Sequence, residues 1–336
     1  MRKVLTQVWL KRGLLACILW PISACFGCLV RSRQWLYRLG VFKSQHLPVP
    51  VLVVGNVLVG GVGKTPVVMA LVEHLRQRGL HVGVLSRGYG RTTRDQREVH
   101  ASSQAQDVGD EPLLIARRCG VPVWVAADRA AAGEALLQKY PNIQVLVCDD
   151  GLQHLALARD IEVCVFDERD VGNGWLLPAG PLREPWPRAA ALDVNRFELT
   201  SAATPSSPRY QVRKQLAHFA VRADGTQRSL QDLRMTPVQA IAGIAKPQVF
   251  FDMLAAQGLS LTNTQALADH ADMRDVVINE RLGDVLCTEK DAVKLWPLHP
   301  TVWAVPLLTT LPPELLQAID ARLDSKLSSH HGLQTT

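Results

Sequence analysis

Glycines, a lysine and a hydroxyl follow an apolar segment, Val51–Gly55, in a spacing suited to binding a polyphosphate. The chain continues Asn56-Val57-Leu58-Val59-Gly60-Gly61-Val62-Gly63-Lys64-Thr65-Pro66. Glycines let backbone N–H groups face phosphate oxygens, a lysine reaches the β- and γ-phosphates, and a hydroxyl at a helix start holds Mg²⁺. The residues predicted to bind a nucleotide are Leu58, Val59, Gly60, Gly61, Val62, Gly63, Lys64 and Thr65.

This loop departs from the usual phosphate-loop pattern at one position. The first glycine of G-x-x-x-x-G-K-[ST] falls on Leu58, so a purely structural glycine turn is the alternative. A strand pattern before the loop and a helix pattern after it, Val67–Arg78, favour nucleotide binding. Partition-type ATPases share GGVGKT but carry a lysine just before the two glycines, where this chain has Val59.

A second group of candidate residues follows another apolar segment, Gln144–Cys148. Asp149 and Asp150 come directly after it, at the carboxyl end of a predicted buried strand, where open α/β sheets bind ligands. Carboxylates there would hold the Mg²⁺ that the nucleotide phosphates coordinate, directly or through water. We therefore predict Thr65, Asp149 and Asp150 as metal ligands. His154, four residues on, is equally consistent with a structural and a functional role.

Strand-like and helical segments alternate from Val51 to Phe166, which indicates a doubly wound, mostly parallel sheet of the P-loop NTPase type. The pattern loosens over Thr200–Pro208, and a second, smaller α/β unit follows. We predict three parts: a membrane-associated segment at 1–45, a P-loop nucleotide-binding domain at 46–200 and a smaller α/β domain at 201–330.

Positive charge is concentrated at the start of the chain. The formal net charge is +6, yet residues 1–50 contain eight Lys or Arg and no Asp or Glu. The remainder is slightly acidic, so the basic balance does not indicate a nucleic-acid-binding protein. The seven cysteines are scattered and contain one C-x-x-C, at Cys25 and Cys28, which argues against zinc and for a reducing compartment.

Gly13–Val30 is 18 residues long and uncharged, and basic residues flank it on both sides. This length is at the lower limit for a membrane-spanning helix, and Pro21 lies in its middle. We expect a membrane-associated helix that either spans the bilayer or lies in its surface. A cleaved secretory signal and a buried helix are the alternatives.

Several short motifs in a fixed order resemble one enzyme family. They are VGNVLVGGVGKTP, SRGYGR, VGDEP, CDDGLQH, GNGWLLPAGPLRE, IAGIAKPQVFF, LADH and TEKDAVK. Together with the basic and apolar start, this set resembles the tetraacyldisaccharide 4′-kinases of lipid A biosynthesis over nearly the whole chain.

The resemblance implies transfer of the γ-phosphate of ATP, with Mg²⁺, to the 4′-hydroxyl of tetraacyldisaccharide 1-phosphate, giving lipid IVA. It also implies a location at the cytoplasmic face of the inner membrane, attached peripherally or by a single N-terminal anchor. Asp110 is the implied general base with His270 as its partner, beside the catalytic Lys64, and Arg183 and Glu184 are implied near the phosphates. We expect no nucleic acid and no obligate protein partner.

Other interpretations remain open for these residues. Asp110 alone reads as a helix cap before Pro112, and His270 alone as a surface histidine. The Glu289–Asp291 segment indicates a structural or hinge role. A P-loop ATPase that switches partner or membrane binding, and a membrane scaffold with a degenerate nucleotide site, are the rival functions.

Overall fold

The computed structural model describes residues 9–188, 194–202, 209–274, 276–279 and 283–332, which form two compact units. Unit 1 comprises Met1–Arg87, Asp128–Val212 and Leu311–Thr336, and unit 2 comprises Gly88–Ala127 and Arg213–Thr310. The division predicted from composition, 46–200 and 201–330, is contiguous, whereas these units interleave along the chain. Segment 88–127 groups with the later part of the sequence.

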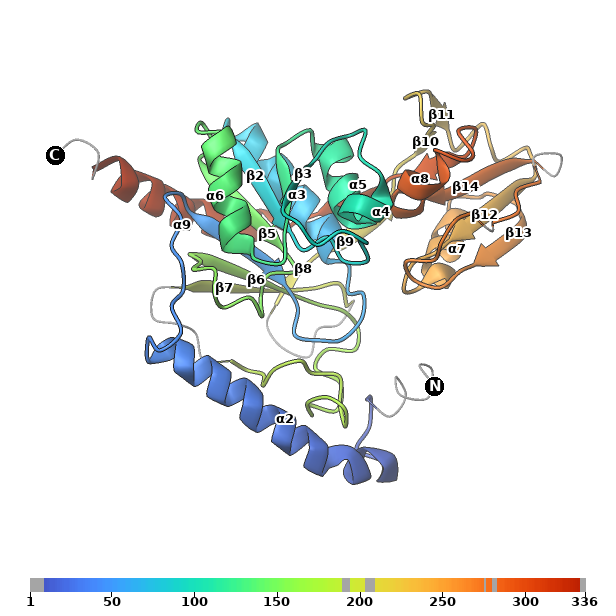
Figure 1. The fold of residues 1–336 in the computed structure, drawn as a ribbon. Helices are drawn as coiled ribbons and strands as arrows, with labels where there is room; N and C mark the ends of the chain where they lie inside the picture. Colours follow the sequence, from blue (N-terminus) through green and yellow to red (C-terminus); the bar gives the residue numbers. More distant parts are fainter. Residues whose placement is uncertain (1–8, 189–193, 203–208, 275, 280–282, 333–336) are drawn as a thin grey trace. The chain divides into compact units, whose positions relative to one another are not determined.

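Unit 1 is built on a parallel sheet (Figure 1). Its neighbouring strands all pair in parallel, as predicted for a doubly wound fold. In spatial order they are β2 (Val82–Ser86), β5 (Val145–Asp149), β1 (Val51–Gly55), β6 (Ile161–Phe166), β7 (Asn195–Thr200) and β8 (Tyr210–Gln211). Every residue of β1, β2, β5 and β6 is buried, which explains why their sequences are mostly apolar.

The strand order of this sheet reverses at β1. The chain adds β2 and β5 on one side of β1 and later adds β6 on the other. In open α/β sheets, ligands bind beyond the carboxyl ends of the strands at such a reversal. The loop that follows β1 therefore starts at the favoured position for a binding site.

Helices pack against this sheet and join distant parts of the chain. α3 (Lys64–Gln77) contacts β1, β2 and β5, and α6 (Arg129–Lys139) contacts β2. Asp128 caps α6 by accepting hydrogen bonds from the amides of its first turn. α9 (Pro313–Gly332) meets α3 through charge: Arg78 donates to Asp320 at 3.0 Å and to Asp324 at 2.8 Å.

The apolar start of the chain forms α2 (Leu14–Arg38), a helix long and apolar enough to cross a membrane. Only 17% of its most apolar 18-residue window is buried. Large apolar side chains are therefore exposed along it, namely Leu14, Leu15, Ile18, Trp20, Ile22, Leu29 and Trp35. Unlike a core helix, α2 presents most of its apolar surface outward.

One buried contact fixes α2 to the rest of unit 1. The hydroxyl of Ser23, which is 3% exposed, donates to the carbonyl of Leu176 at 2.8 Å and accepts from the amide of Ala179 at 2.9 Å. Nearer the start of α2, the Arg12 side chain donates to the carbonyl of Asn173. The segment around 173–179 is thus the surface on which α2 rests.

Unit 2 contains a second α/β sheet. Its strands, in spatial order, are β11 (Gln227–Ser229), β10 (Phe219–Val221), β15 (Trp303–Val305), β14 (Asp284–Thr288), β12 (Val238–Ala242) and β13 (Leu261–Ala266). The strands from β15 to β13 are parallel, and β10 pairs antiparallel with both of its neighbours. The prediction of a smaller α/β fold in this part of the chain is confirmed.

The remaining elements of unit 2 are short. Two further strand pairs are antiparallel: β3 (Arg97–Val99) with β4 (Val123–Val125), and β9 (Arg213–Leu216) with β16 (Leu307–Thr310). The helices are α4 (Ala105–Val108), α5 (Asp110–Cys119), α7 (Pro247–Ala256) and α8 (Glu289–Leu295).

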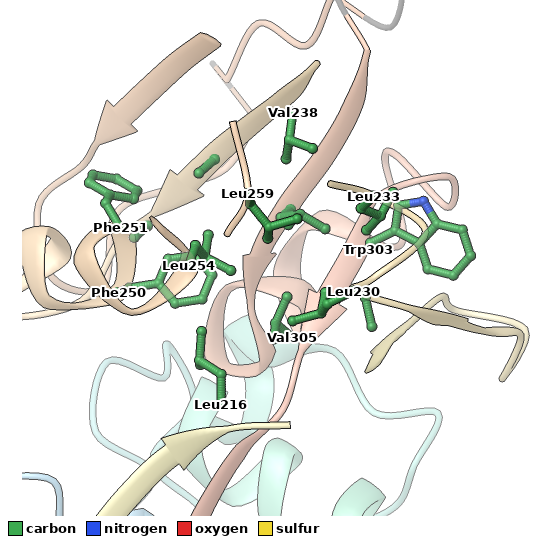
Figure 2. Close-up of a cluster of buried hydrophobic side chains, with 14 residues drawn as sticks. Leu216, Leu230, Leu233, Val238, Phe250, Phe251, Leu254, Leu259, Trp303 and Val305 are labelled. Atoms are coloured by element: carbon green, nitrogen blue, oxygen red, sulfur yellow. The ribbon is translucent and has the colours of Figure 1, made fainter. Parts of the chain in front are cut away.

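Apolar clusters cover both faces of the unit 2 sheet. On one face, Phe250, Phe251 and Leu254 of α7 pack with Val238 of β12 and with Trp303 (Figure 2). Intervening residues of the same strands contribute to a second cluster, which contains Ile241, Val285, Cys287 and Ala304. This alternation is the expected period of two.

Candidate functional site

The phosphate loop joins β1 to α3. Gly60 and Gly63 have φ values of 99° and 76°, a region that favours glycine because other residues are strained there. Gly63 is the N-cap of α3 and gives no side-chain hydrogen bond to the first turn. The amides at the start of α3, whose partial charge is positive, therefore suit an anion.

Three of the residues predicted to bind the nucleotide make contacts within the protein that fix the loop in place. The side chains of Leu58 and Val62 are buried, at 0% and 3% exposure. The amide of Val59 donates to the carbonyl of Pro181 at 2.9 Å, and its carbonyl accepts from Arg169 at 3.0 Å. Apolar residues at 58 and 62 thus fill core positions, and direct nucleotide contacts by Leu58, Val59 and Val62 stay a prediction.

Lys64 and Asp150 lie together at the end of the sheet. The Lys64 ammonium is 3.3 Å from the Asp150 carboxylate and 3.4 Å from the side-chain oxygen of Asn56. Arg183 lies on the same carboxylate, at 3.7 Å. Burial would raise the pKa of Asp150, but the charges of Lys64 and Arg183 hold it below its usual value. The structure therefore brings three predicted residues into one charged group.

Thr65 and Asp149 supply the oxygen atoms next to this group. Both are buried, at 8% and 1% exposure, and Asp149 pairs in register with Val54 near the end of β1. Mg²⁺ prefers hard oxygen ligands and is usually held by one or two carboxylates plus substrate phosphates. In the described residues, no group of three or more His, Cys, Asp or Glu could hold a metal by itself. The donor set fits Mg²⁺ shared with a nucleotide.

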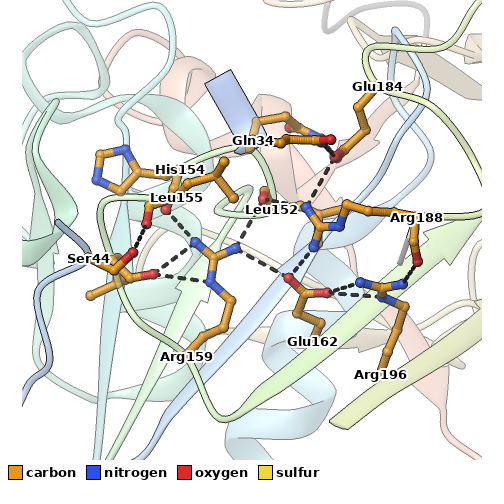
Figure 3. Close-up of polar contacts among 12 residues, drawn as sticks. Gln34, Ser44, Leu152, His154, Leu155, Arg159, Glu162, Glu184, Arg188 and Arg196 are labelled. Atoms are coloured by element: carbon orange, nitrogen blue, oxygen red, sulfur yellow. Dashed lines mark hydrogen bonds and ion pairs between the residues drawn. The ribbon is translucent and has the colours of Figure 1, made fainter. Parts of the chain in front are cut away.

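Glu184, also predicted near the phosphates, lies in a buried hydrogen-bond network (Figure 3). Its carboxylate is 2% exposed and accepts from Gln34 of α2 at 3.0 Å, from Gln153 at 2.8 Å and from Arg188 at 3.1 Å. Gln153 also donates to the carbonyl of Asn56 at 2.9 Å. Glu184 thus connects α2 to the phosphate loop, and contact with the nucleotide itself stays a prediction.

The same network continues to Glu162, the second residue of β6. Its carboxylate, nearly fully buried, pairs with Arg188, with Arg159 at 3.4 Å and with Arg196 at 2.9 Å (Figure 3). Burial would raise the pKa of Glu162, but these three guanidinium groups lower it. Burying an unpaired charge inside a sheet costs free energy. The three arginines offset that cost for the Glu162 carboxylate.

A cavity of about 310 Å³ lies between α2 and two other parts of the chain, around Gln153 and around Arg183. Phe26, Leu29 and Val30 of α2 form its apolar wall. Arg33, Gln34, Gln153, Leu155, Arg183 and Glu184 complete the lining. The cavity can therefore receive a ligand that is part apolar and part polar or anionic.

Asp110 and His270 meet in unit 2. Asp110 is the first residue of α5 and is 5% exposed, and its two carboxylate oxygens lie 3.1 and 3.0 Å from Nδ1 of His270. Burial would raise the pKa of Asp110, but the hydrogen bond with His270 and nearby lysine charges lower it. The same hydrogen bond raises the pKa of His270. The contact has the geometry of a carboxylate–histidine pair, and its catalytic role stays a prediction.

His154 lies apart from that pair and accepts a long hydrogen bond from the amide of Arg129, at 3.4 Å. Burial, with the Arg129 charge, lowers the pKa of His154 to about 4. The imidazole is therefore neutral near pH 7, which favours the structural interpretation.

Sequence reasoning missed two polar residues that organise the site. Asn56 is fully buried, donates to the carbonyl of Leu58 at 2.8 Å and accepts from Lys64. Gln153 joins Asn56 to Glu184. A polar side chain directly after a buried strand was a usable signal for Asn56, whereas the long-range partners of Gln153 left no pattern in the sequence.

Comparison with known proteins decides among the possible families. A sequence profile described as tetraacyldisaccharide-1-P 4′-kinase matches residues 15–324. The chain belongs to the tetraacyldisaccharide-1-phosphate 4′-kinase family. The tetraacyldisaccharide 4′-kinase of Acidovorax ebreus is 53% identical over 329 residues, covering 97% of this chain and 96% of the relative.

Other family members agree over the full length. The tetraacyldisaccharide 4′-kinase of Polaromonas naphthalenivorans is 51% identical over 344 residues and covers all of both chains. The crystal structure of LpxK from Aquifex aeolicus in complex with ATP has a TM-score of 0.79 and 29% identity, covering 92% of this chain and 100% of that one. The family resemblance and the predicted fold class are thereby confirmed.

Proposed function

We propose that this family member transfers the γ-phosphate of ATP to the 4′-hydroxyl of tetraacyldisaccharide 1-phosphate, forming lipid IVA. The observation that carries the proposal is the charged group of Lys64, Asp150 and Arg183 beside the loop before α3. Phosphoryl transfer needs positioning and neutralisation of phosphate charge, and this group provides both.

In this proposal, unit 1 binds the nucleotide. Lys64 and the first amides of α3 bind the phosphates, and Lys64 exchanges its contact with Asp150 for the γ-phosphate. Thr65 and Asp149 or Asp150 would hold Mg²⁺, which neutralises charge on the phosphate oxygens. Arg183 adds a fixed cation for phosphate oxygens.

Unit 2 supplies the proton acceptor. Asp110 takes the proton of the 4′-hydroxyl while the hydroxyl oxygen bonds to the γ-phosphorus, and the bond from that phosphorus to the oxygen of the β-phosphate breaks. The products are the 4′-phosphorylated lipid and ADP. His270 orients the Asp110 carboxylate through its Nδ1 hydrogen bond.

The acceptor explains the membrane-associated part of the chain. Four acyl chains leave a bilayer only at a cost of about 0.8 kcal/mol per CH₂ group, so the enzyme must act at the bilayer. The exposed apolar side chains of α2 suit such a surface. The cavity beside α2 would receive part of the lipid, with apolar groups towards Phe26 and Leu29. Because ATP is cytosolic, we propose the cytoplasmic face of the inner membrane.

The test is transfer from γ-labelled ATP to tetraacyldisaccharide 1-phosphate in detergent micelles with Mg²⁺. We expect labelled bisphosphorylated lipid from the wild type and almost none from Lys64→Ala. Asp110→Asn should lower kcat by about 10²- to 10⁴-fold with little change in the KM for ATP. ATP hydrolysis without labelled lipid would contradict the proposal and favour a switch ATPase instead.

A further inference from the structure

The ammonium group of Lys290 lies against the far side of His270. Lys290 is the second residue of α8, and its Nζ is 3.3 Å from Nε2 of His270. It is also 3.0 Å from Asp269 and 3.2 Å from Glu111. An ammonium has three hydrogens and no lone pair, so three acceptors surround three donors.

This contact determines which ring nitrogen of His270 carries the proton. Because Lys290 can only donate, Nε2 must accept, and the single proton of a neutral imidazole then belongs on Nδ1. Nδ1 faces both carboxylate oxygens of Asp110, at 3.0 and 3.1 Å. An imidazolium would instead direct an N–H at an ammonium, which is repulsive.

We propose that Lys290 is a positioning residue that keeps His270 neutral, with its proton on Nδ1, so that Asp110 remains the anionic acceptor. This inference rests on the proposed function of Asp110 as the base. It gives a role to a segment whose sequence indicated only a structural or hinge function.

The charges around His270 agree with this assignment. The groups that face it are Asp110 and Glu111 of α5, Lys290 and Lys294 of α8, Asp269 of its own loop, and the ring of Tyr89 at 5.0 Å. Three carboxylates meet two ammonium groups, so one negative charge remains when His270 is neutral. That charge is available to accept the hydroxyl proton.

Lys290 counteracts the effect of the carboxylates on His270. The hydrogen bond with Asp110 raises the pKa of His270 above its ordinary value, and the opposing charge of Lys290 limits this rise. Lys290 itself stays charged, because although burial lowers its pKa, the charges of Glu111, Asp110 and Asp269 raise it above the usual value. Without Lys290, His270 would protonate at higher pH and, as an imidazolium, would make Asp110 a weaker base.

The first measurement is the ¹⁵N spectrum of histidine-labelled full-length protein in micelles, with His270 assigned by its absence in His270→Gln. We expect a protonated Nδ1 and an unprotonated Nε2 in the wild type. A protonated Nε2 at neutral pH would overturn the proposal. This readout needs no phosphate transfer, so it tests Lys290 even if the proposed kinase activity fails.

The second measurement is the pH dependence of kcat for three variants. The acid limb is the part of this profile in which kcat falls as the pH decreases. Lys290→Met should move it to higher pH by about one unit, as expected for losing a charge this close. Lys290→Arg keeps the charge and should keep the limb. Arg274→Met, which removes an exposed cation paired with Asp272, is the matched control.

A uniform loss of kcat in Lys290→Met, with an unmoved limb, would show a merely structural role and overturn the proposal. If Lys290→Met fails to fold, the proposal is still tested by the ring nitrogen that carries the proton in wild-type His270 and by the pH profile of kcat in Lys290→Arg. A limb displaced in Lys290→Arg as well would also contradict the argument from charge.

Discussion

Single residues in this protein are held in charge states that their neighbours impose. Asp110 stays ionised although it is buried, because His270 and two lysines surround it. His270 adopts a φ of 62°, an uncommon conformation for a residue other than glycine, and this turn directs its ring at Asp110. Local strain at such a position is typical of a site where geometry matters more than stability.

His154 offers a test of these charge effects on stability. Its folded pKa, about 4, lies below the unfolded value near 6.5, so the unfolded chain binds the proton more readily. The stabilisation is complete above pH 6.5 and is lost as the pH falls towards 4. Between pH 7 and pH 5 the loss should be about 1 kcal/mol, allowing for solvent screening of a partly exposed ring.

Chemical denaturation of the wild type and of His154→Gln at both pH values measures this effect. The variant should show a smaller fall in the free energy of unfolding between pH 7 and pH 5. Equal falls in the two proteins would contradict a neutral, partly buried His154.

At this scale the sequence indicates which of the candidate residues meet where chain geometry dictates it. The carboxyl ends of β1 and β5 are adjacent, so Lys64 and Asp150 had to meet. Glu184 was predicted near phosphates, but its carboxylate lies among Gln34, Gln153 and Arg188. Those partners come from distant segments, and only the folded chain reveals them.

Among the elements, α2 combines two surfaces with opposite chemistry. One contains Ser23 and Gln34, which hydrogen-bond to the segment 176–184. The other exposes residues such as Ile18 and Leu29, at 63% and 71%. The sequence predicted the apolar character of this helix, but not which side chains would face the protein.

The exposed surface of α2 provides a test of the proposed membrane association. Replacing both Ile18 and Leu29 with Asn removes two apolar side chains that would each contribute about 1.5–3 kcal/mol when buried in lipid. Binding to vesicles of inner-membrane lipid composition should therefore weaken at least tenfold in a flotation assay.

Met235→Asn is the matched control for this experiment, because Met235 is 91% exposed and lies in unit 2. It should bind vesicles as the wild type does. Unchanged binding of the Ile18 and Leu29 double variant would contradict the proposed membrane surface.

At the largest scale, a network of buried charges connects strand β6 of unit 1 to helix α2. Glu162 of β6 pairs with three arginines, one of which, Arg188, also reaches Glu184 and thereby α2. Glu162→Leu would remove the carboxylate partner of Arg159 and Arg196 and leave Arg188 with Glu184 alone. Removing one partner of a buried ion pair costs about 3–5 kcal/mol, so the free energy of unfolding should fall by that amount.

Denaturation monitored by tryptophan fluorescence measures the loss. Asp95→Asn breaks an exposed pair with Arg97 and should leave stability unchanged. If Glu162→Leu matched this control, the network would contribute specificity rather than stability.

The sequence predicted the central sheet because its buried strands are mostly apolar segments. β1 has the limits of the apolar segment Val51–Gly55, and β5 is displaced by one residue from the segment Gln144–Cys148. Short strands such as β3 and β16 were not predicted, since three or four residues are too few to show a strand pattern. The interleaving of the two units was missed as well, because it depends on contacts between segments far apart in the chain.

The pairing of α9 with α3 has a consequence for synthesis on the ribosome. Arg78 and Asp324 are separated by 246 positions, so α3 waits for its partner while the intervening chain is translated. At about 5–20 residues per second, that delay is roughly 10–50 s. α2 emerges before either helix and can reach the bilayer first. If α2 attaches to the bilayer as proposed, unit 1 completes its folding with one end already held there.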